Sequence, residues 1–165
     1  MNPFFQQSPL PYQYPQFDKV KDTDFAPAFD RGMAEQAREI QAIADSRKAP
    51  TFDNTILAME RSGQLLTRAA IAFGNLTSTN TNDALDKLDA AYSPKFAAHR
   101  DSIYLNAKLF ARIKALYEKR AGLGLDEQGV RLIERYYIDF VRAGANLTEA
   151  QKTRVKEINA EMATL

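Results

Sequence analysis

Apolar residues recur at helical spacing through almost the whole chain after its first 17 residues. This spacing gathers apolar side chains on one face of each helix, and other helices must cover that face. The apolar runs contain no convincing strand pattern, and no motif repeats at a fixed period. The sequence therefore predicts an all-α fold, an elongated antiparallel bundle of about six or seven helices.

Capping and breaking residues set the expected helix boundaries. The first two helices are predicted to run from about Asp24 to Ser46 and from about Asn54 to Leu76. The polar run Thr77–Asn82 is predicted to be a loop, and Pro94 is expected to break or kink the helix after it. Gly144 is expected to end the last helix but one. The N-caps expected for the later helices are Thr81 or Asn82, Asn106, Asp126 and Thr148.

Two helix-disfavouring residues are accommodated in this scheme. Pro27 is placed in the first turn of the first helix, where its missing N–H costs nothing. Gly63 is placed in the middle of the second helix, at a cost of about 1 kcal/mol relative to alanine. The inward-facing residues expected in the second helix are Ile56, Met59, Leu66, Ala70 and Phe73.

Residues 1–22 are predicted to form an extended N-terminal arm, and residues 23–165 a helical domain. Four prolines alternate with five aromatic residues in the first 17 positions, and the prolines exclude a helix there. The arm could be a polyproline ligand for a partner protein, but no two prolines have the P-x-x-P spacing. An ordered strap whose rings pack on the helical body is the preferred interpretation.

The last expected helix runs to the end of the chain. Thr148 has a glutamine three residues later, as a capping box requires, and Val155, Ile158 and Met162 follow at helical spacing. No glycine, proline or polar tail stops this helix, so we expect it to be truncated, with further polypeptide covering its apolar stripe. Without that cover, the last turns should be frayed or should pack on a neighbouring copy, which would give a dimer.

Charge and composition exclude several classes of function. Residues 1–80 carry 8 basic and 9 acidic side chains, and residues 81–165 carry 14 and 12, for a net charge of +1. Neither half therefore has the positive excess that nucleic acid or an anionic membrane requires. No apolar run approaches the roughly 20 residues of a membrane span. The lack of cysteine fits a reducing compartment, and we expect a cytoplasmic protein, or a periplasmic one if a leader preceded Met1.

No residue is predicted to be catalytic or to bind a metal, and none can be assigned to substrate. His99 is the one histidine, so the chain cannot supply an H-E-x-x-H zinc site, and a solvated side chain is expected. Asp83, Asp86 and Asp89 share a helix face and could hold a cation, but a solvated acidic face is preferred. Four further polar residues could line a groove or only occupy its rim. These are Glu60, Glu134, Tyr136 and Tyr137.

A series of short motifs occurs in order along the chain. They are N-P-F at Asn2, L-P-Y at Leu10, P-A-F-D-R-G-M from Pro27, F-D-N-T-I from Phe52, S-G-x-L-L from Ser62, D-S-I-Y-L-N from Asp101, L-G-L-D from Leu123, R-L-I-E from Arg131, F-V-x-A-G-A from Phe140 and N-x-E-x-A-T-L from Asn159. Together they resemble the N-terminal helical region of bacterial peptidyl-dipeptidase, in the zinc oligopeptidase family that includes oligopeptidase A, thimet oligopeptidase and neurolysin.

The resemblance implies a zinc metallopeptidase that hydrolyses short oligopeptides and releases C-terminal dipeptides. In that family the zinc is bound by H-E-x-x-H and a downstream glutamate, all C-terminal to the matched region, so no catalytic residue carries over. The family's N-terminal helices form part of the wall of a deep channel above the zinc, which admits short unstructured peptides. The resemblance therefore implies a segment that holds no cofactor, limits access to substrate and is inert alone.

Two other hypotheses come from different classes of function. One is a stand-alone helical module that binds peptides or a partner protein. The other is a structural bundle that dimerises through the last helix.

Overall fold

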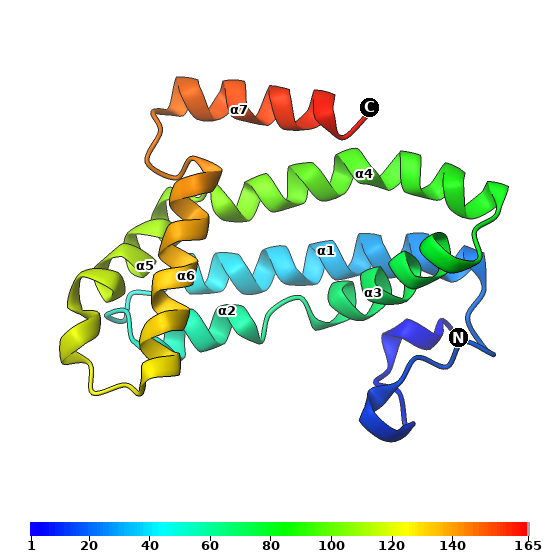
Figure 1. Cartoon of the computed structure of the whole chain (residues 1–165), viewed down its shortest axis with the longest axis horizontal. Coiled ribbons are helices and arrows are strands. Elements are labelled where there is room, and N and C mark those ends of the chain that lie inside the picture. Colours follow the sequence, from blue (N-terminus) through cyan, green and yellow to red (C-terminus); the bar gives the residue numbers. More distant parts are fainter. Residues whose placement is uncertain (165) are drawn as a thin grey trace. The chain divides into compact units, whose positions relative to one another are not determined.

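The computed structural model describes residues 1–164, and every regular element in that range is helical, which confirms the all-α prediction (Figure 1). The α-helices are α1 (Asp22–Ala44), α2 (Ala58–Glu60), α3 (Gln64–Thr79), α4 (Asp83–Tyr104), α5 (Ala107–Lys119), α6 (Glu127–Ala143) and α7 (Glu149–Met162). The 3-10 turns are η1 (Pro3–Phe5), η2 (Pro11–Gln13) and η4 (Arg120–Gly122), and η3 (Phe52–Leu57) is a π-helix.

The chain divides into two compact units. The first unit comprises Met1–Gln36 and Gly63–Ser93, and the second comprises Ala37–Ser62 and Pro94–Leu165. No helix within residues 1–164 is long and apolar enough to cross a membrane.

The core of the first unit is a cluster of aromatic rings. Phe25 and Phe29 of α1 are fully buried, and the ring of Phe73 from α3 lies edge-on against both, at centroid separations of 5.1 and 5.3 Å. The ring of Tyr92 from α4 lies 5.1 Å from that of Phe29. Aromatic pairs of this kind contribute roughly 0.5–1.5 kcal/mol beyond the burial of their surface. The four rings therefore hold three helices of this unit together.

Gly32 allows α1 to pack closely against α3. A Cβ atom built on Gly32 would lie 2.8 Å from both the backbone nitrogen and the Cα of Leu66. Real Cβ atoms do not approach backbone atoms that closely, and backbone cannot move aside as a flexible side chain can. Glycine is therefore required here for the packing of the two helices.

The prediction of one continuous second helix is wrong, because the helix is interrupted at Gly63. This residue has φ +68°, a left-handed conformation that glycine adopts without strain, and it is the N-cap of α3. The interruption also changes which side of the following helix is buried. Leu65 and Ala69 are buried, one position earlier than the Leu66 and Ala70 that the sequence predicted.

Two other expected interruptions are smaller or absent. α3 continues to Thr79, so the loop predicted from Thr77 is reduced to residues 80–82. The hydroxyls of Thr77 and Thr79 donate to carbonyls one turn earlier, at 3.1 and 2.6 Å, so both side chains have hydrogen-bond partners within the helix. α4 is continuous through Pro94, so the predicted break is absent, whereas a kink there stays a prediction. α1 begins two residues earlier than predicted, so Pro27 lies beyond its first turn.

The predicted caps are confirmed. Asn82, Asn106 and Asp126 accept backbone N–H bonds at the starts of α4, α5 and α6. Thr148 and Gln151 form the predicted capping box at the start of α7. Gly144 ends α6 in a left-handed conformation, with φ 104°. These local signals therefore set most helix ends.

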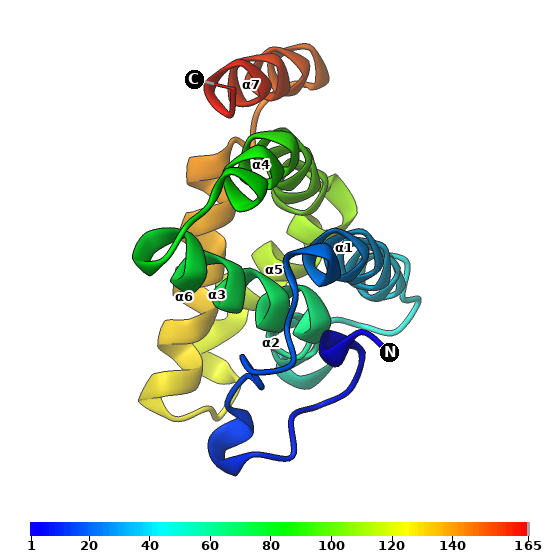
Figure 2. The same ribbon diagram turned by 90° about the vertical axis from the view of Figure 1, so that its right-hand side faces the viewer.

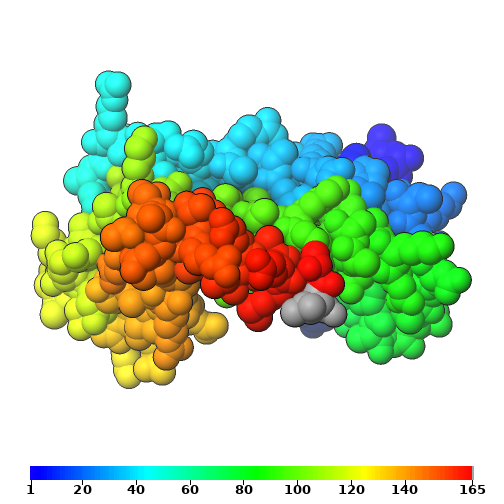
Figure 3. Space-filling view, turned by 90° about the horizontal axis from the view of Figure 1, so that it is seen from above, coloured from blue at the N-terminus to red at the C-terminus, as the bar shows by residue number. Residues whose placement is uncertain are grey.

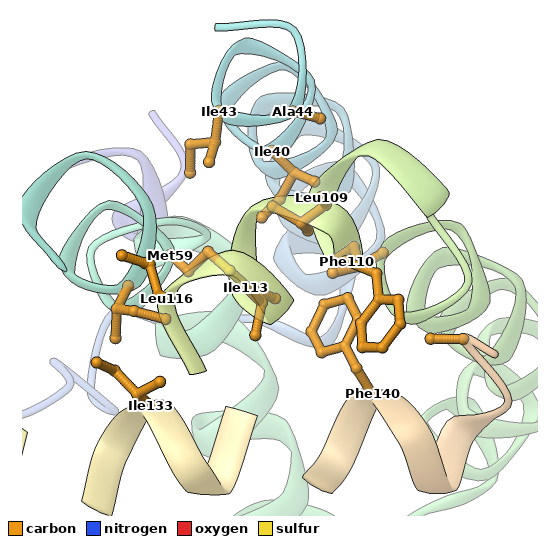
Figure 4. Packing of buried hydrophobic residues seen from close by; sticks show 13 residues of the cluster. Ile40, Ile43, Ala44, Met59, Leu109, Phe110, Ile113, Leu116, Ile133 and Phe140 are labelled. Atoms are coloured by element: carbon orange, nitrogen blue, oxygen red, sulfur yellow. The ribbon is translucent and has the colours of Figure 1, made fainter. Parts of the chain in front are cut away.

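The core of the second unit is mostly aliphatic (Figure 4). Ile113 of α5 and Ile133 of α6 are fully buried within it, and Phe140 stacks on Phe110 at a centroid separation of 6.2 Å. The same cluster includes Met59, so α2 is anchored in it as well. The other buried members are Ile40, Ile43, Ala44, Ile56, Ile103, Leu109, Leu116 and Ala145.

Arg112 is a buried cation that organises the segment between α1 and η3. Its side chain is 7% exposed, and no carboxylate in residues 1–164 pairs with it. Nη1 donates to the carbonyls of Ser46 and Lys48 at 3.1 and 2.9 Å. Nη2 donates to Asn54 Oδ1 and Thr55 Oγ1 at 2.8 and 3.2 Å. Four acceptors from one connection thus replace the missing counter-ion.

α7 lies on the surface in the space-filling view of Figure 3. Ile158 and Met162 are 39% and 66% exposed, so the described part of the chain leaves much of their surface open to solvent. The helix is regular to Met162, and the predicted fraying of its last turns stays a prediction. Asn159 Nδ2 donates to Asp101 Oδ1 at 2.8 Å and attaches α7 to α4. The final residue of the chain, up to which the helix was predicted to continue, lies outside the described residues.

Replacing Gly32 with alanine should destabilise the chain. The new methyl group would meet the backbone of α3, and overpacking of this kind costs roughly 1–3 kcal/mol. Gly74 is the matched control, because it is also helical but has no atom within 4 Å of an added Cβ. Gly74→Ala should stabilise by about 0.5–1 kcal/mol. Denaturant unfolding measures both changes, and a stabilising Gly32→Ala would contradict the close packing.

Replacing Arg112 with methionine should also destabilise the chain. The substitution keeps an apolar stem but leaves several acceptors without donors, at about 1–3 kcal/mol for each one that water cannot reach. Lys114→Met, at an exposed position of the same helix, is the control and should change stability by less than about 0.5 kcal/mol. Equal unfolding free energies for the two variants would show that Arg112 has no such role.

Candidate functional site

A large cavity lies in the first unit, between the N-terminal arm and α3. It has a volume of about 670 Å³. Figure 2 shows the arm looping below α3. We call this space the arm cavity. Its lining residues are Pro3, Phe4, Gln6, Ser8, Tyr12, Gln13, Tyr14, Pro15, Gln16, Phe17, Val20, Arg68, Ile71, Asn75, Leu76 and Thr79.

The arm is attached to the helices at its first residues. Phe4 is buried with its ring 5.1 Å from that of Phe25, so the packing predicted for the arm's rings is confirmed for Phe4 but not for Tyr14, which is exposed. Asn2 Nδ2 donates to the carbonyl of Asp24 at 2.6 Å, and Arg68 Nη2 donates to the carbonyl of Phe4 at 3.0 Å. Tyr12, in contrast, is fully exposed. The arm is therefore packed on the helices at its start and exposed to solvent in its middle.

The middle of the arm has an unusual backbone. Tyr12 and Gln13 have φ values of 56° and 59°, in the left-handed region that bulky residues rarely adopt. Ser8 holds this turn closed, because its hydroxyl donates to the carbonyl of Tyr14 at 2.6 Å and accepts from the N–H of Leu10 at 3.2 Å. The strained turn forms one side of the arm cavity.

Arg68 is the one charged residue among those that line the arm cavity. It is half-buried, and its Nε is buried without a hydrogen-bond partner. No carboxylate in residues 1–164 forms an ion pair with it. Arg68 was not among the residues that the sequence placed near a groove, although a signal existed: it is the single charge in the apolar run from Leu65 to Phe73.

A second cavity, of about 350 Å³, lies in the second unit and is polar. It is lined by Glu60, Tyr104, Leu132, Arg135, Tyr136 and Asp139. Tyr136 donates its hydroxyl to Glu60 Oε1 at 2.6 Å. Burial, together with this hydrogen bond and the charge of Glu60, raises the pKa of Tyr136. The phenol therefore stays protonated near neutral pH, where it can donate a hydrogen bond but cannot act as a base.

The structure separates the four polar residues that the sequence placed near a groove. Glu60 and Tyr136 meet in the polar cavity. Glu134 instead accepts from Arg120 Nε at 2.9 Å, and Tyr137 stacks on Tyr117 at a centroid separation of 3.9 Å. Only one pair of the four therefore lines a cavity, and the other two residues link neighbouring elements.

His99 and the acidic face of α4 do not form a metal site. His99 is half-buried, not solvated as predicted, and burial lowers its pKa. Asp83, Asp86 and Asp89 are exposed, and Asp86 accepts a hydrogen bond from Thr81. Within residues 1–164, no three His, Cys, Asp or Glu side chains are placed to hold a metal ion.

Two curated proteins match the chain over its whole length. Dipeptidyl carboxypeptidase of Salmonella typhimurium is 48% identical over 164 residues, which cover 99% of this chain and 24% of that protein. Dipeptidyl carboxypeptidase of Escherichia coli is 47% identical over 165 residues, which cover 100% of this chain and 24% of that protein. The chain thus spans about a quarter of the length of these relatives. No family model matches the sequence. The similarity confirms the resemblance to bacterial peptidyl-dipeptidases that the motifs indicated.

Replacing Glu60 with glutamine should lower the pKa of Tyr136 toward the ordinary tyrosine value of 10.0. The substitution keeps an acceptor for the phenol but removes the negative charge that opposes its ionisation. Since the pKa of Tyr136 is raised by folding, its contribution to stability is complete below pH 10 and is lost as the pH rises further. Glu60→Gln should weaken that loss.

The measurement is the phenolate absorbance of the chain, titrated against its Tyr136→Phe variant so that the difference reports Tyr136 alone. Glu134→Gln, which removes a carboxylate that pairs with Arg120, is the control and should leave the titration unchanged. A Tyr136 that ionises near pH 10 in the unmodified chain would contradict the hydrogen bond to Glu60.

Proposed function

We propose that this chain, which is similar along its whole length to bacterial dipeptidyl carboxypeptidases, forms the N-terminal helical part of such a peptidase. The observation that carries the proposal is an identity of 48% over 99% of the chain, confined to 24% of the relative. The parent protein would release C-terminal dipeptides from short oligopeptides. Oligopeptides would therefore be its substrates.

Zinc is the proposed cofactor of the parent protein, but the residues described here do not fit a catalytic zinc site. Such a site needs three protein ligands and an open position for water. The chain contains one histidine and no cysteine. Residues 1–164 also place no three suitable side chains together. Peptide-bond cleavage is therefore assigned to the remaining part of the parent protein.

A steric role suits the helical segment better than a chemical one. A wall that excludes folded proteins must keep its shape when it meets them. The aromatic core of the first unit, the close packing at Gly32 and the hydrogen bonds of Arg112 each restrict movement within a unit. We infer that the segment helps to line the channel that leads to the zinc and limits entry to short, unstructured peptides.

A chimera tests this proposal. The matching quarter of Escherichia coli dipeptidyl carboxypeptidase would be replaced by this chain, and release of C-terminal dipeptides from a short blocked peptide would be measured. We expect kcat/KM of the chimera to be within about tenfold of that of the unaltered Escherichia coli protein, because the catalytic groups are unchanged. A chimera that is folded and monodisperse but inactive would contradict the proposal.

The isolated chain is the necessary control. With added zinc and the same peptide, it should release no dipeptide, because its side chains cannot assemble the metal site. Zinc-dependent turnover by the chain alone would refute the assignment of cleavage to the rest of the parent protein. The relative with its matching quarter deleted shows how much activity depends on the presence of this segment.

A further inference from the structure

The residues that line the arm cavity carry one positive charge and no negative charge. Arg68 is its one charged lining residue, and none of the lining residues is acidic. The guanidinium has five N–H donors, of which the described structure uses one, for the carbonyl of Phe4. Its Nε is buried without a partner, and a buried donor left unpaired costs free energy. The cavity therefore offers an anion one cation that has unused donors and no competing carboxylate among the lining residues.

The remaining lining of the arm cavity is suited to an apolar body. Phe4, Phe17, Val20 and Leu76 contribute apolar surface around Arg68. Ile71 of α3 also lines the cavity and is 58% exposed, so its aliphatic side chain has little cover from the chain itself. An apolar group bound here would remove this surface from water. A purely ionic ligand, such as inorganic phosphate, would leave it exposed.

Polar groups at the rim can meet a peptide backbone. Gln13 lines the cavity, and its side-chain amide has no hydrogen-bond partner within residues 1–164. Its backbone belongs to the left-handed turn that Ser8 holds closed, so the point from which the side chain projects is set before any ligand arrives. Ligand sites typically combine a mostly apolar lining with a few placed polar groups of this kind, in roughly 300–1,000 Å³.

We propose that the arm cavity binds the C-terminal end of a short peptide, with its carboxylate on Arg68 and an aromatic or aliphatic final side chain against Ile71 and the arm. The site binds its ligand and performs no chemistry. It would bind such a ligand whether or not the chain belongs to a peptidase. Binding would also hold the arm on α3, because the ligand contacts both.

The test uses the peptide N-acetyl-leucyl-phenylalanine and its C-terminal amide, titrated calorimetrically into the full chain. The acid should bind saturably, and the amide should bind at least about tenfold more weakly, because it cannot form a charge-assisted bond to the guanidinium. Acid and amide of equal affinity, or an acid that does not bind, would overturn the proposal.

Substitutions at Ile71 test the location of the site while keeping the guanidinium of Arg68 and its donor to the carbonyl of Phe4. Ile71→Glu places a negative charge in the cavity and should weaken binding of the acid by about fivefold or more, whereas Ile71→Lys should strengthen it. Ile138→Glu is the matched control, since Ile138 is 41% exposed on α6 and lines neither cavity. Equal effects of Glu at positions 71 and 138 would place the ligand elsewhere.

Arg68→Gln tests the cation itself. Glutamine keeps a donor for the carbonyl of Phe4 but removes the charge, so the variant should bind acid and amide with the same weak affinity. Its thermal unfolding shows whether the arm has been lost together with the charge. If Arg68→Gln does not fold, the two substitutions at Ile71 still test the site, because they should change the affinity for the acid in opposite directions. An Ile71→Glu variant that binds the acid as tightly as Ile71→Lys would exclude a site at Arg68.

Discussion

The hydrogen bonds of Arg112 are the constraint on which the second unit most depends. Hydrogen bonds to a charged group contribute roughly 1.5–3 kcal/mol each, about twice the value for neutral pairs. Arg112 makes four, and all its acceptors lie within residues 46–55. Those acceptors converge only when the connection after α1 is folded. The surface ion pair between Lys108 and Asp45 joins the same two regions, but it is exposed to solvent and adds little.

Local signals predicted the helices well, and long-range packing explains the errors. N-caps such as Asn106 and Asp126 act within three residues, so the sequence alone locates them. Glycine inside a helix costs only about 1 kcal/mol, so Gly63 alone does not predict that the helix breaks there. The break depends on tertiary packing. Pro94 is the reverse case. Proline strongly disfavours a helix, yet α4 continues through it because buried residues on either side, such as Tyr92 and Ile103, keep the helix packed.

The candidate sites were less predictable than the fold, because they join residues far apart in the chain. The bond from Arg68 to Phe4 spans 64 positions, and that from Tyr136 to Glu60 spans 76. A single sequence carries no information on such pairs beyond the type of each residue. Residue type was enough to select Glu60 and Tyr136 as polar groups on helices. Residue type alone could not show that Arg68 lies next to the N-terminal arm. The aromatic residues of the arm indicated only that the arm packs on the helices.

The π-helix η3 makes the length of its segment as important as its composition. A π-turn contains about one residue more than an α-turn, so it is equivalent to an insertion in a helix. Removing one residue between Phe52 and Leu57 would let the segment become ordinary α-helix and would leave Met59 and Glu60 close to their present faces. Adding a residue has no such outlet and would rotate the adjoining helix α2 by about 100°, which would carry Met59 out of the aliphatic core and Glu60 away from the hydroxyl of Tyr136. Homologous proteins that preserve this pair should therefore tolerate the loss of one residue in the segment far more readily than the gain of one.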